Sequence, residues 1–148
     1  MGAGKPFLGP PRLCMSEPRS HGGRVARFFT IDQANALLPA LTQLLDHLLQ
    51  VRDHLVARRP DVNAALKKSA ENGGNRPAGL AVEEFEEFQS VVLELKGLGV
   101  LLKDIDMGLV DFPSRRDGRE VYLCWRKGEP RVAFWHEMDS GYAGRRPL

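Results

Sequence analysis

The sequence predicts a mainly α-helical α+β protein, in which an antiparallel two-helix, coiled-coil-like hairpin precedes a small antiparallel β module. Two observations predict this fold class. Between residues 28 and 98, apolar residues recur at alternating spacings of three and four through two segments, which is typical of packed helices. Residues 99–148 instead carry short runs of β-branched and aromatic residues separated by glycine and proline turns, which is typical of strands.

The length of 148 residues indicates one domain, which we place at 28–148, behind a disordered basic tail at 1–27. The tail is rich in Gly, Pro, Arg and Ser and has five basic residues against one acid, whereas the whole chain has a net charge of +2. The remaining chain is therefore slightly acidic, which argues against a nucleic-acid-binding core. Met15 is an alternative native start to Met1.

No apolar run approaches the roughly 20 residues that a membrane-spanning helix needs, and the first thirty residues contain no signal-peptide pattern. The two cysteines, Cys14 and Cys124, form neither a disulfide framework nor a zinc-binding motif by their spacing. We therefore expect a cytoplasmic protein in a reducing compartment.

The first long helix begins near Phe28, because Thr30 followed by Gln33 is a capping-box pattern. Pro39 should kink or split this helix, and Pro60 should end it. A heptad seam runs along the helix through Leu37, Leu41, Leu44, Leu48, Val51 and Leu55. Further leucines widen this apolar stripe beyond what one partner helix covers, which favours self-association through the helices.

A weak helical stretch at Val62–Ala70 and a flexible loop at 70–79 separate this helix from a second one at about Leu80–Leu98. The seam of the second helix consists of Phe85, Phe88, Val92 and Leu95. With a connection of this length, we expect the two helices to lie antiparallel.

The β module should contain short extended segments at Val100–Leu102 and Leu109–Pro113 and a hairpin of two longer strands, Glu120–Arg126 and Arg131–Glu137. A four-residue turn at Lys127–Pro130 would pair residues whose numbers sum to 257. This register predicts an apolar face toward the helices, made of Val121, Leu123, Trp125, Val132, Phe134 and His136.

The opposite face of the hairpin would then pair Tyr122 with Trp135, Cys124 with Ala133, and Glu120 with Glu137. Cys124 and His136 would lie on opposite faces, which argues against a Cys–His pair. An odd number of residues in the turn would exchange the faces of one strand.

Five segments of the chain together form a recognisable pattern: Thr30–Pro39, Lys103–Pro113, Gly118–Trp125, Phe134–Glu137 and Gly141–Leu148. In these segments the chain resembles the DUF2203 family of uncharacterised bacterial proteins. The resemblance covers about residues 28–148 and supports one ordered domain there, but the family implies no activity and no site residues.

A divalent metal site is one hypothesis for the β module, because imidazole and carboxylate groups suit zinc, manganese or non-haem iron. The candidate ligands are His136, Glu120, Glu137 and Asp139, with further carboxylates approaching from Asp104, Asp106 and Asp111. A histidine hydrogen-bonded into the core is the simpler interpretation of His136, because the ligand spacing matches no known motif.

A small-anion site is a second hypothesis, with Arg119 and Arg145 as ligands beside the glycine-rich segment that contains Gly141 and Gly144. Plainer roles for these arginines are ion pairs with nearby carboxylates and exposure to solvent.

No nucleophile motif, phosphate-binding loop or dinucleotide fingerprint occurs in the sequence. We therefore favour a non-enzymatic interaction protein that forms homo-oligomers through its helices. The alternative is a metal- or anion-binding protein, or an enzyme, that uses the C-terminal module around His136, Glu120 and Glu137.

Overall fold

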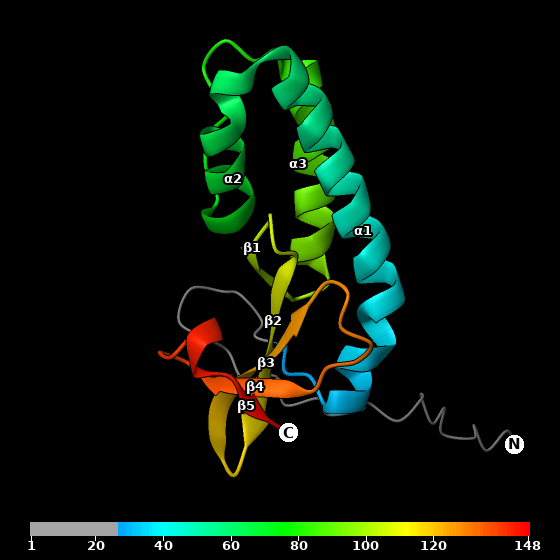
Figure 1. Cartoon of the computed structure of the whole chain (residues 1–148), viewed down its shortest axis with the longest axis vertical. Helices are drawn as coiled ribbons and strands as arrows, with labels where there is room; N and C mark the ends of the chain where they lie inside the picture. The colour runs from blue at the N-terminus through cyan, green and yellow to red at the C-terminus, as the bar shows by residue number, and fades with distance from the viewer. Residues whose placement is uncertain (1–26) are drawn as a thin grey trace, which may run out of the picture.

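The computed structural model describes residues 27–148, so the predicted tail lies outside the described residues apart from Arg27. The chain forms a helical layer followed by a five-stranded antiparallel sheet, which confirms the predicted α+β fold class (Figure 1). The helices are α1 (Ile31–Arg58), the one-turn η1 (Pro60–Val62), α2 (Asn63–Asn72) and α3 (Val82–Gly97). The strands are β1 (Leu101–Asp104), β2 (Leu109–Arg116), β3 (Arg119–Arg126), β4 (Phe134–Glu137) and β5 (Arg146–Pro147), with one-turn η2 (Tyr142–Gly144) between the last two.

The helix α1 begins at the predicted cap. The Thr30 hydroxyl accepts a hydrogen bond from the Gln33 amide at 3.1 Å, and the Gln33 side chain accepts one from the Thr30 amide at 3.0 Å. The helix continues through Pro39 without being split and ends at Arg58, just before Pro60.

Replacing Thr30 by alanine should lower the free energy of unfolding by about 1 kcal/mol, because the Gln33 amide at the start of α1 loses the hydroxyl that caps it. Urea denaturation followed by circular dichroism measures the change. Thr42→Ala is the matched control, since the Thr42 hydroxyl donates to the Leu38 carbonyl oxygen inside the helix and caps nothing. Equal stability losses in the two variants would contradict the capping role.

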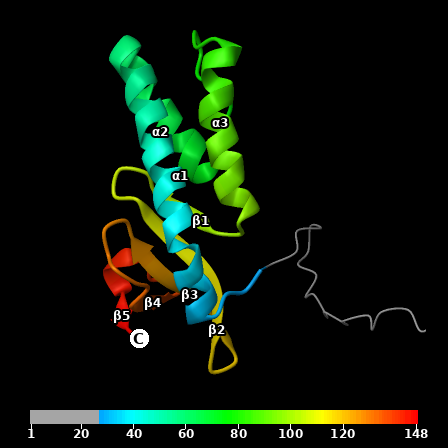
Figure 2. The ribbon, with the colours of Figure 1, turned by 90° about the vertical axis from the view of Figure 1, so that its right-hand side faces the viewer.

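The helices α1 and α3 pack antiparallel, as predicted, and the short helix α2 packs against β1 (Figures 1 and 2). The buried stripe of α1 is rotated slightly from the predicted seam, because Leu38 and Leu45 are buried whereas Leu37 and Leu44 are only half-buried. All four predicted seam residues of α3 are buried. Self-association and a coiled coil stay predictions, since the contacts described here lie within one chain.

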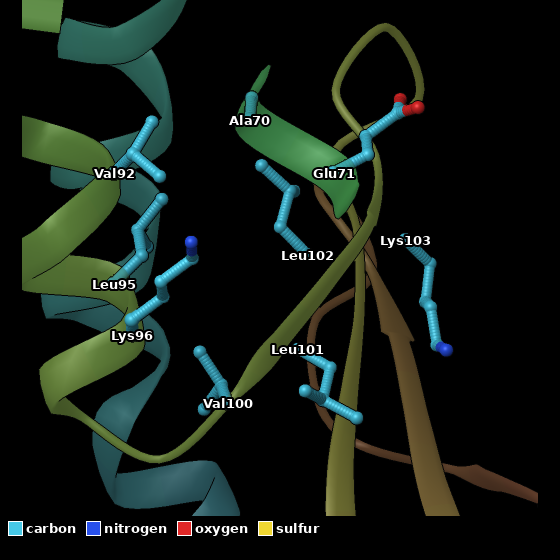
Figure 3. Close-up of a pocket in the computed structure, with 9 residues that line it drawn as sticks. All are labelled: Ala70, Glu71, Val92, Leu95, Lys96, Val100, Leu101, Leu102 and Lys103. Carbon is cyan, nitrogen blue, oxygen red and sulfur yellow. The ribbon is translucent and has the colours of Figure 1, made fainter. Parts of the chain in front are cut away.

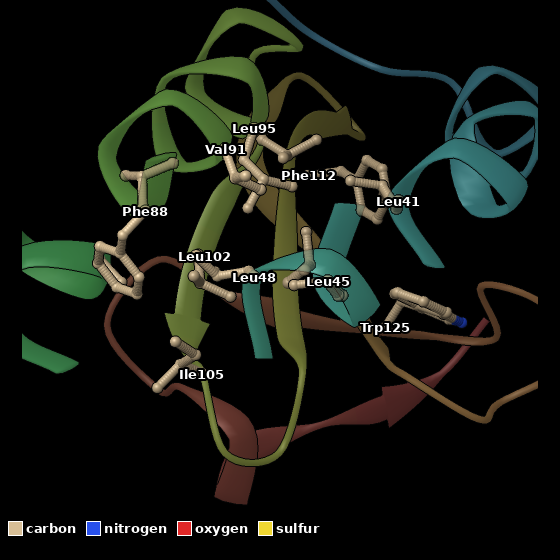
Figure 4. Packing of buried hydrophobic residues seen from close by; sticks show 14 of the residues in the cluster. Leu41, Leu45, Leu48, Phe88, Val91, Leu95, Leu102, Ile105, Phe112 and Trp125 are labelled. Atoms are coloured by element: carbon tan, nitrogen blue, oxygen red, sulfur yellow. The ribbon is translucent and has the colours of Figure 1, made fainter. Parts of the chain in front are cut away.

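One hydrophobic core joins the helices to a single face of the sheet. Figure 4 shows Leu41, Leu45 and Leu48 of α1 beside Phe112 of β2 and Trp125 of β3. The segment before α1 is hydrogen-bonded to β2, because the Phe29 amide donates to the Pro113 carbonyl oxygen at 2.7 Å. This packing fixes which face of each strand is turned away from the helices. Within residues 27–148, no helix is long and apolar enough to cross a membrane.

Candidate metal centre

The register of the C-terminal hairpin differs from the prediction by one residue. Cys124 pairs with Phe134, and Tyr122 pairs with His136, so the paired numbers sum to 258 instead of 257. The strand β4 starts only at Phe134, because the preceding residues bond elsewhere: the Val132 amide donates to the Asn35 side-chain oxygen of α1 at 2.7 Å. The predicted pairing of Glu120 with Glu137 and the predicted separation of Cys124 from His136 are therefore wrong.

This change of register exchanges the faces of β4. Trp135 now joins the core on the helix side, while His136 lies on the outer face of the sheet. Side chains alternate along a strand, so Asp111 and Cys124, which are direct cross-strand partners, share that outer face with His136. Three neighbouring strands thus bring one carboxylate, one thiol and one imidazole together.

The three groups are close and enclosed. One potential ligand atom from each of Asp111, Cys124 and His136 lies within 4.8 Å of the other two. The Asp111 and His136 side chains are each 2% exposed, and Cys124 is completely buried. Buried polar groups normally have hydrogen-bond partners, so an atom of this group without one would indicate a missing ligand.

The imidazole of His136 lies between two acceptors. Its Nδ1 is 2.7 Å from the carbonyl oxygen of Glu137, and its Nε2 is 3.0 Å from Oδ2 of Asp111. A carbonyl oxygen only accepts, so Nδ1 carries a proton and donates to it. A neutral ring then presents the Nε2 lone pair to the carboxylate, and either a second proton or a cation is needed between Nε2 and Oδ2.

The remaining atoms of the cluster are poorly partnered in the described part of the chain. Oδ1 of Asp111 is buried and has no hydrogen-bond partner there. Burial, reinforced by the negative charge of Asp111, raises the pKa of the Cys124 thiol to about 12. Without a metal, Cys124 is therefore an uncharged, unreactive thiol rather than a nucleophile.

A family model described as an uncharacterised conserved protein, DUF2203, matches residues 27–148. The chain belongs to the DUF2203 family. Its resemblance to that family, first indicated by five short segments, is thus confirmed over the whole described domain. Comparisons with curated proteins and with solved structures gave no match. The description of the DUF2203 family carries no activity, so the function has to be argued from the site.

The other predicted metal ligands do not join His136. Glu137 lies on the helix side of the sheet, where its carboxylate forms an ion pair with the Arg119 guanidinium at 3.3 Å. Glu120 is paired across the sheet with Arg115, and Asp139 is exposed after the end of β4. Of the four predicted ligands, only His136 belongs to the buried group. Asp111, which was expected to approach His136 from the preceding segment, does so.

The two arginines of the predicted anion site both have carboxylate partners. Arg119 pairs with Glu137, and Arg145 pairs with Glu129 at 2.7 Å. Burial opposes the charge of Arg145, but the hydrogen bond with Glu129 and the interactions with Cys124, Glu129 and Tyr142 together outweigh it and raise the arginine's pKa. Both side chains therefore form the ion pairs that were predicted as the alternative to an anion site.

Four cavities within residues 27–148 are lined by residues other than Asp111, Cys124 and His136. The smallest of these cavities, about 90 Å³, lies between α2, α3 and β1 on the other side of the sheet. Figure 3 shows that Val92, Leu95 and Leu102 face this space, beside the amine of Lys96. Glu71 and Lys103 also line it, but no cysteine or histidine does, so this cavity lacks the ligand types of a transition-metal site.

Proposed function

We propose that this DUF2203 protein binds a divalent transition metal, foremost Zn²⁺, between Asp111, Cys124 and His136. The observation that carries the proposal is the buried convergence of these three ligand types on one sheet face, with Oδ1 of Asp111 left without a partner. A buried charged oxygen without a partner costs more than the roughly 1–3 kcal/mol of a neutral one, and a cation removes that cost.

The spacing of the group suits a small cation after small movements of the side chains. Zinc binds thiolate sulfur at about 2.3 Å and imidazole nitrogen or carboxylate oxygen at about 2.0–2.2 Å, which places tetrahedral ligand atoms about 3.3–3.8 Å apart. The candidate atoms already lie within 4.8 Å of one another on three hydrogen-bonded strands. Rotation of the side chains is enough to close the difference.

The hydrogen bonding of His136 is the kind that orients a metal ligand. Metal-binding histidines usually donate the second ring N–H to a carbonyl or carboxylate, which fixes the ring and its tautomer. Here Nδ1 donates to the Glu137 carbonyl oxygen and leaves Nε2 aimed at Asp111 and the centre of the group.

The ligand types select the metal class. A thiolate with an imidazole favours zinc over magnesium or calcium, which prefer sites built from oxygen alone. Binding would also ionise Cys124, because a thiol that coordinates the metal through its sulfur releases its proton to solvent. Since these ligands line none of the four cavities described above, we propose metal binding without assigning a catalytic role.

The test uses the full chain in a Cys14→Ser background, so that Cys124 is the only thiol. After removal of metals with a chelator and dialysis against Zn²⁺, elemental mass spectrometry should find one zinc per chain. The cobalt-loaded protein should show a thiolate-to-cobalt charge-transfer absorption. The variants Cys124→Ser, His136→Gln and Asp111→Asn should each weaken zinc binding by about 100-fold or more.

The controls come from the ligand set that the sequence suggested. Glu137→Gln should bind zinc within about threefold of the parent chain, because Glu137 lies on the helix side of the sheet and pairs with Arg119. Glu120→Gln should do the same, because Glu120 shares the outer face but is the cross-strand partner of Arg115 and does not belong to the group of three. Absence of zinc from the parent chain would overturn the proposal and leave an imidazolium–aspartate pair in its place. Full binding by the Cys124→Ser variant, or a cobalt spectrum without the thiolate band, would also overturn it.

A further inference from the structure

The burial of the metal ligands needs a cause, because they lie on the face of the sheet that the helices leave uncovered. Phe112, Leu123 and Trp135 fill the core on the helix side, so α1 and α3 do not reach the other face. Figures 1 and 2 show the C-terminal residues, drawn in red, beside β4 at the edge of the sheet. Part of the enclosure comes from the outer face itself, where the Tyr122 ring lies 5.4 Å from the His136 ring. The segment between β4 and β5 supplies a further part.

The residue that connects this C-terminal part to the ligands is Arg145. Its guanidinium lies over the Phe134 ring at 4.1 Å from the centroid and donates to the Cys124 carbonyl oxygen at 3.4 Å. Phe134 is the cross-strand partner of Cys124 on the outer face, so Arg145 sits directly beside the thiol. The ring of Tyr142 lies on the same guanidinium at 4.8 Å.

Little else holds this segment to the sheet. The strand β5 contains only two residues, and one further amide, that of Leu148, donates to the Ala133 carbonyl oxygen at 2.9 Å. Residues 138–143 are exposed. The strongest anchor is the ion pair of Arg145 with Glu129, whose carboxylate also accepts from the Arg126 amide at 2.8 Å. A segment with so few enclosed contacts opens locally far more often than the sheet unfolds.

We infer that residues 138–145 form a removable cover over the Asp111–Cys124–His136 group, held shut by the Arg145–Glu129 ion pair, and that opening of this cover controls access to the site. Insofar as the cover governs metal exchange, the inference rests on the proposed zinc site. The access of other reagents to Cys124 depends on the same opening, whether or not zinc binds.

The first measurement needs no metal. In the metal-free Cys14→Ser chain, Arg145→Ala should speed the alkylation of Cys124 by about tenfold or more, and Glu129→Gln by about threefold or more, because both weaken the closed state. The matched control is Arg119→Ala, which removes an arginine–glutamate pair of similar length on the other side of the sheet. Arg119→Ala should leave the alkylation rate unchanged.

The second measurement follows zinc. With Glu129→Gln, which keeps the charge of Arg145 beside Cys124, the rates of zinc uptake and of zinc loss to excess chelator should rise together. The dissociation constant should then change little, because opening admits and releases the metal equally. Damage to the ligands themselves would instead raise the dissociation constant.

The outcomes separate the two proposals. Alkylation rates that do not respond to Arg145→Ala or Glu129→Gln would overturn the cover, even if zinc binds. Faster alkylation in a chain that takes up no zinc would support the cover while overturning the zinc site. Equal acceleration by Arg119→Ala would also overturn the cover, because the whole sheet would then be loosening.

Discussion

Cys124 of the folded, metal-free protein is expected to react with iodoacetamide at pH 8 about 1000-fold more slowly than Cys124 in the same chain unfolded by urea. The thiolate is the reacting species, and burial, with the charge of Asp111 adding to it, raises the pKa of the thiol from 9.0 to about 12. Three pKa units leave about 1000-fold less thiolate at a given pH below both values. Enclosure by the fold should slow the reaction further.

Mass spectrometry of the labelled peptide, in the Cys14→Ser background with a chelator present, measures this difference. The unfolded chain is the internal reference, because it contains the same thiol without its surroundings. Similar rates in the folded and unfolded chains would contradict the burial of Cys124. They would also remove the basis for a closed site.

The raised pKa of Cys124 also sets a direction for stability at alkaline pH. Above pH 9 the unfolded chain loses the thiol proton while the folded chain keeps it, so the folded state binds more protons and its stability falls as pH rises. The loss is small below pH 9 and reaches about 1 kcal/mol at pH 10. A Cys124→Ala variant, which has no thiol to titrate, should lack this part of the decline in denaturant titrations at pH 8 and pH 10.

The helical layer could be predicted from the sequence because its information is local. The cap at Thr30, the end of α1 before Pro60 and the seam of α3 depend on residues within one or two turns of each other. The two-residue turn at Asp117 and Gly118 is equally local, and both residues have the positive φ angles, 52° and 76°, that a tight hairpin needs. The cap at Thr30, the end of α1 and the seam of α3 were all predicted from the sequence.

The register of the last hairpin could not be predicted in this way. It depends on where the chain rejoins the sheet after Arg126, and that point is set by the bond from the Val132 amide to Asn35, 97 residues away. The local sequence favours a four-residue turn, but the contact with Asn35 fixes a different register. Since one residue of register exchanges the two faces of a strand, the error moved His136 from the core face to the outer face.

The site was partly visible in the sequence through residue types rather than through spacing. Asp111 lies in the apolar run Leu109-Val110-Asp111-Phe112. A carboxylate inside a buried strand is costly unless a hydrogen-bond donor or a cation lies beside it. Together with a strand cysteine and a strand histidine, this was the signal for the buried group. The sequence could not show that the three strands align these residues, because the alignment depends on the hairpin register.

Replacing Leu45 by alanine should lower the free energy of unfolding by about 3–4 kcal/mol, whereas replacing its neighbour Leu44 should cost about 1 kcal/mol. Leu45 is completely buried between the helices and the sheet, and its loss leaves a cavity beside Leu41 and Leu48 (Figure 4). Leu44 only packs against the edge of this core. The predicted heptad seam gave these two positions the opposite ranking, with Leu44 in the seam.

The pair of variants therefore distinguishes the fold of the single chain from a helical interface between chains. Both changes remove the same atoms from adjacent positions of α1, so helix propensity is matched. Urea denaturation at two protein concentrations measures the effect. If Leu44→Ala costs as much as Leu45→Ala, and the loss depends on protein concentration, then Leu44 is buried against a second copy and the single-chain core is not the whole source of stability. A large loss for Leu45→Ala alone, independent of concentration, places that stability within the core that joins α1 to the sheet.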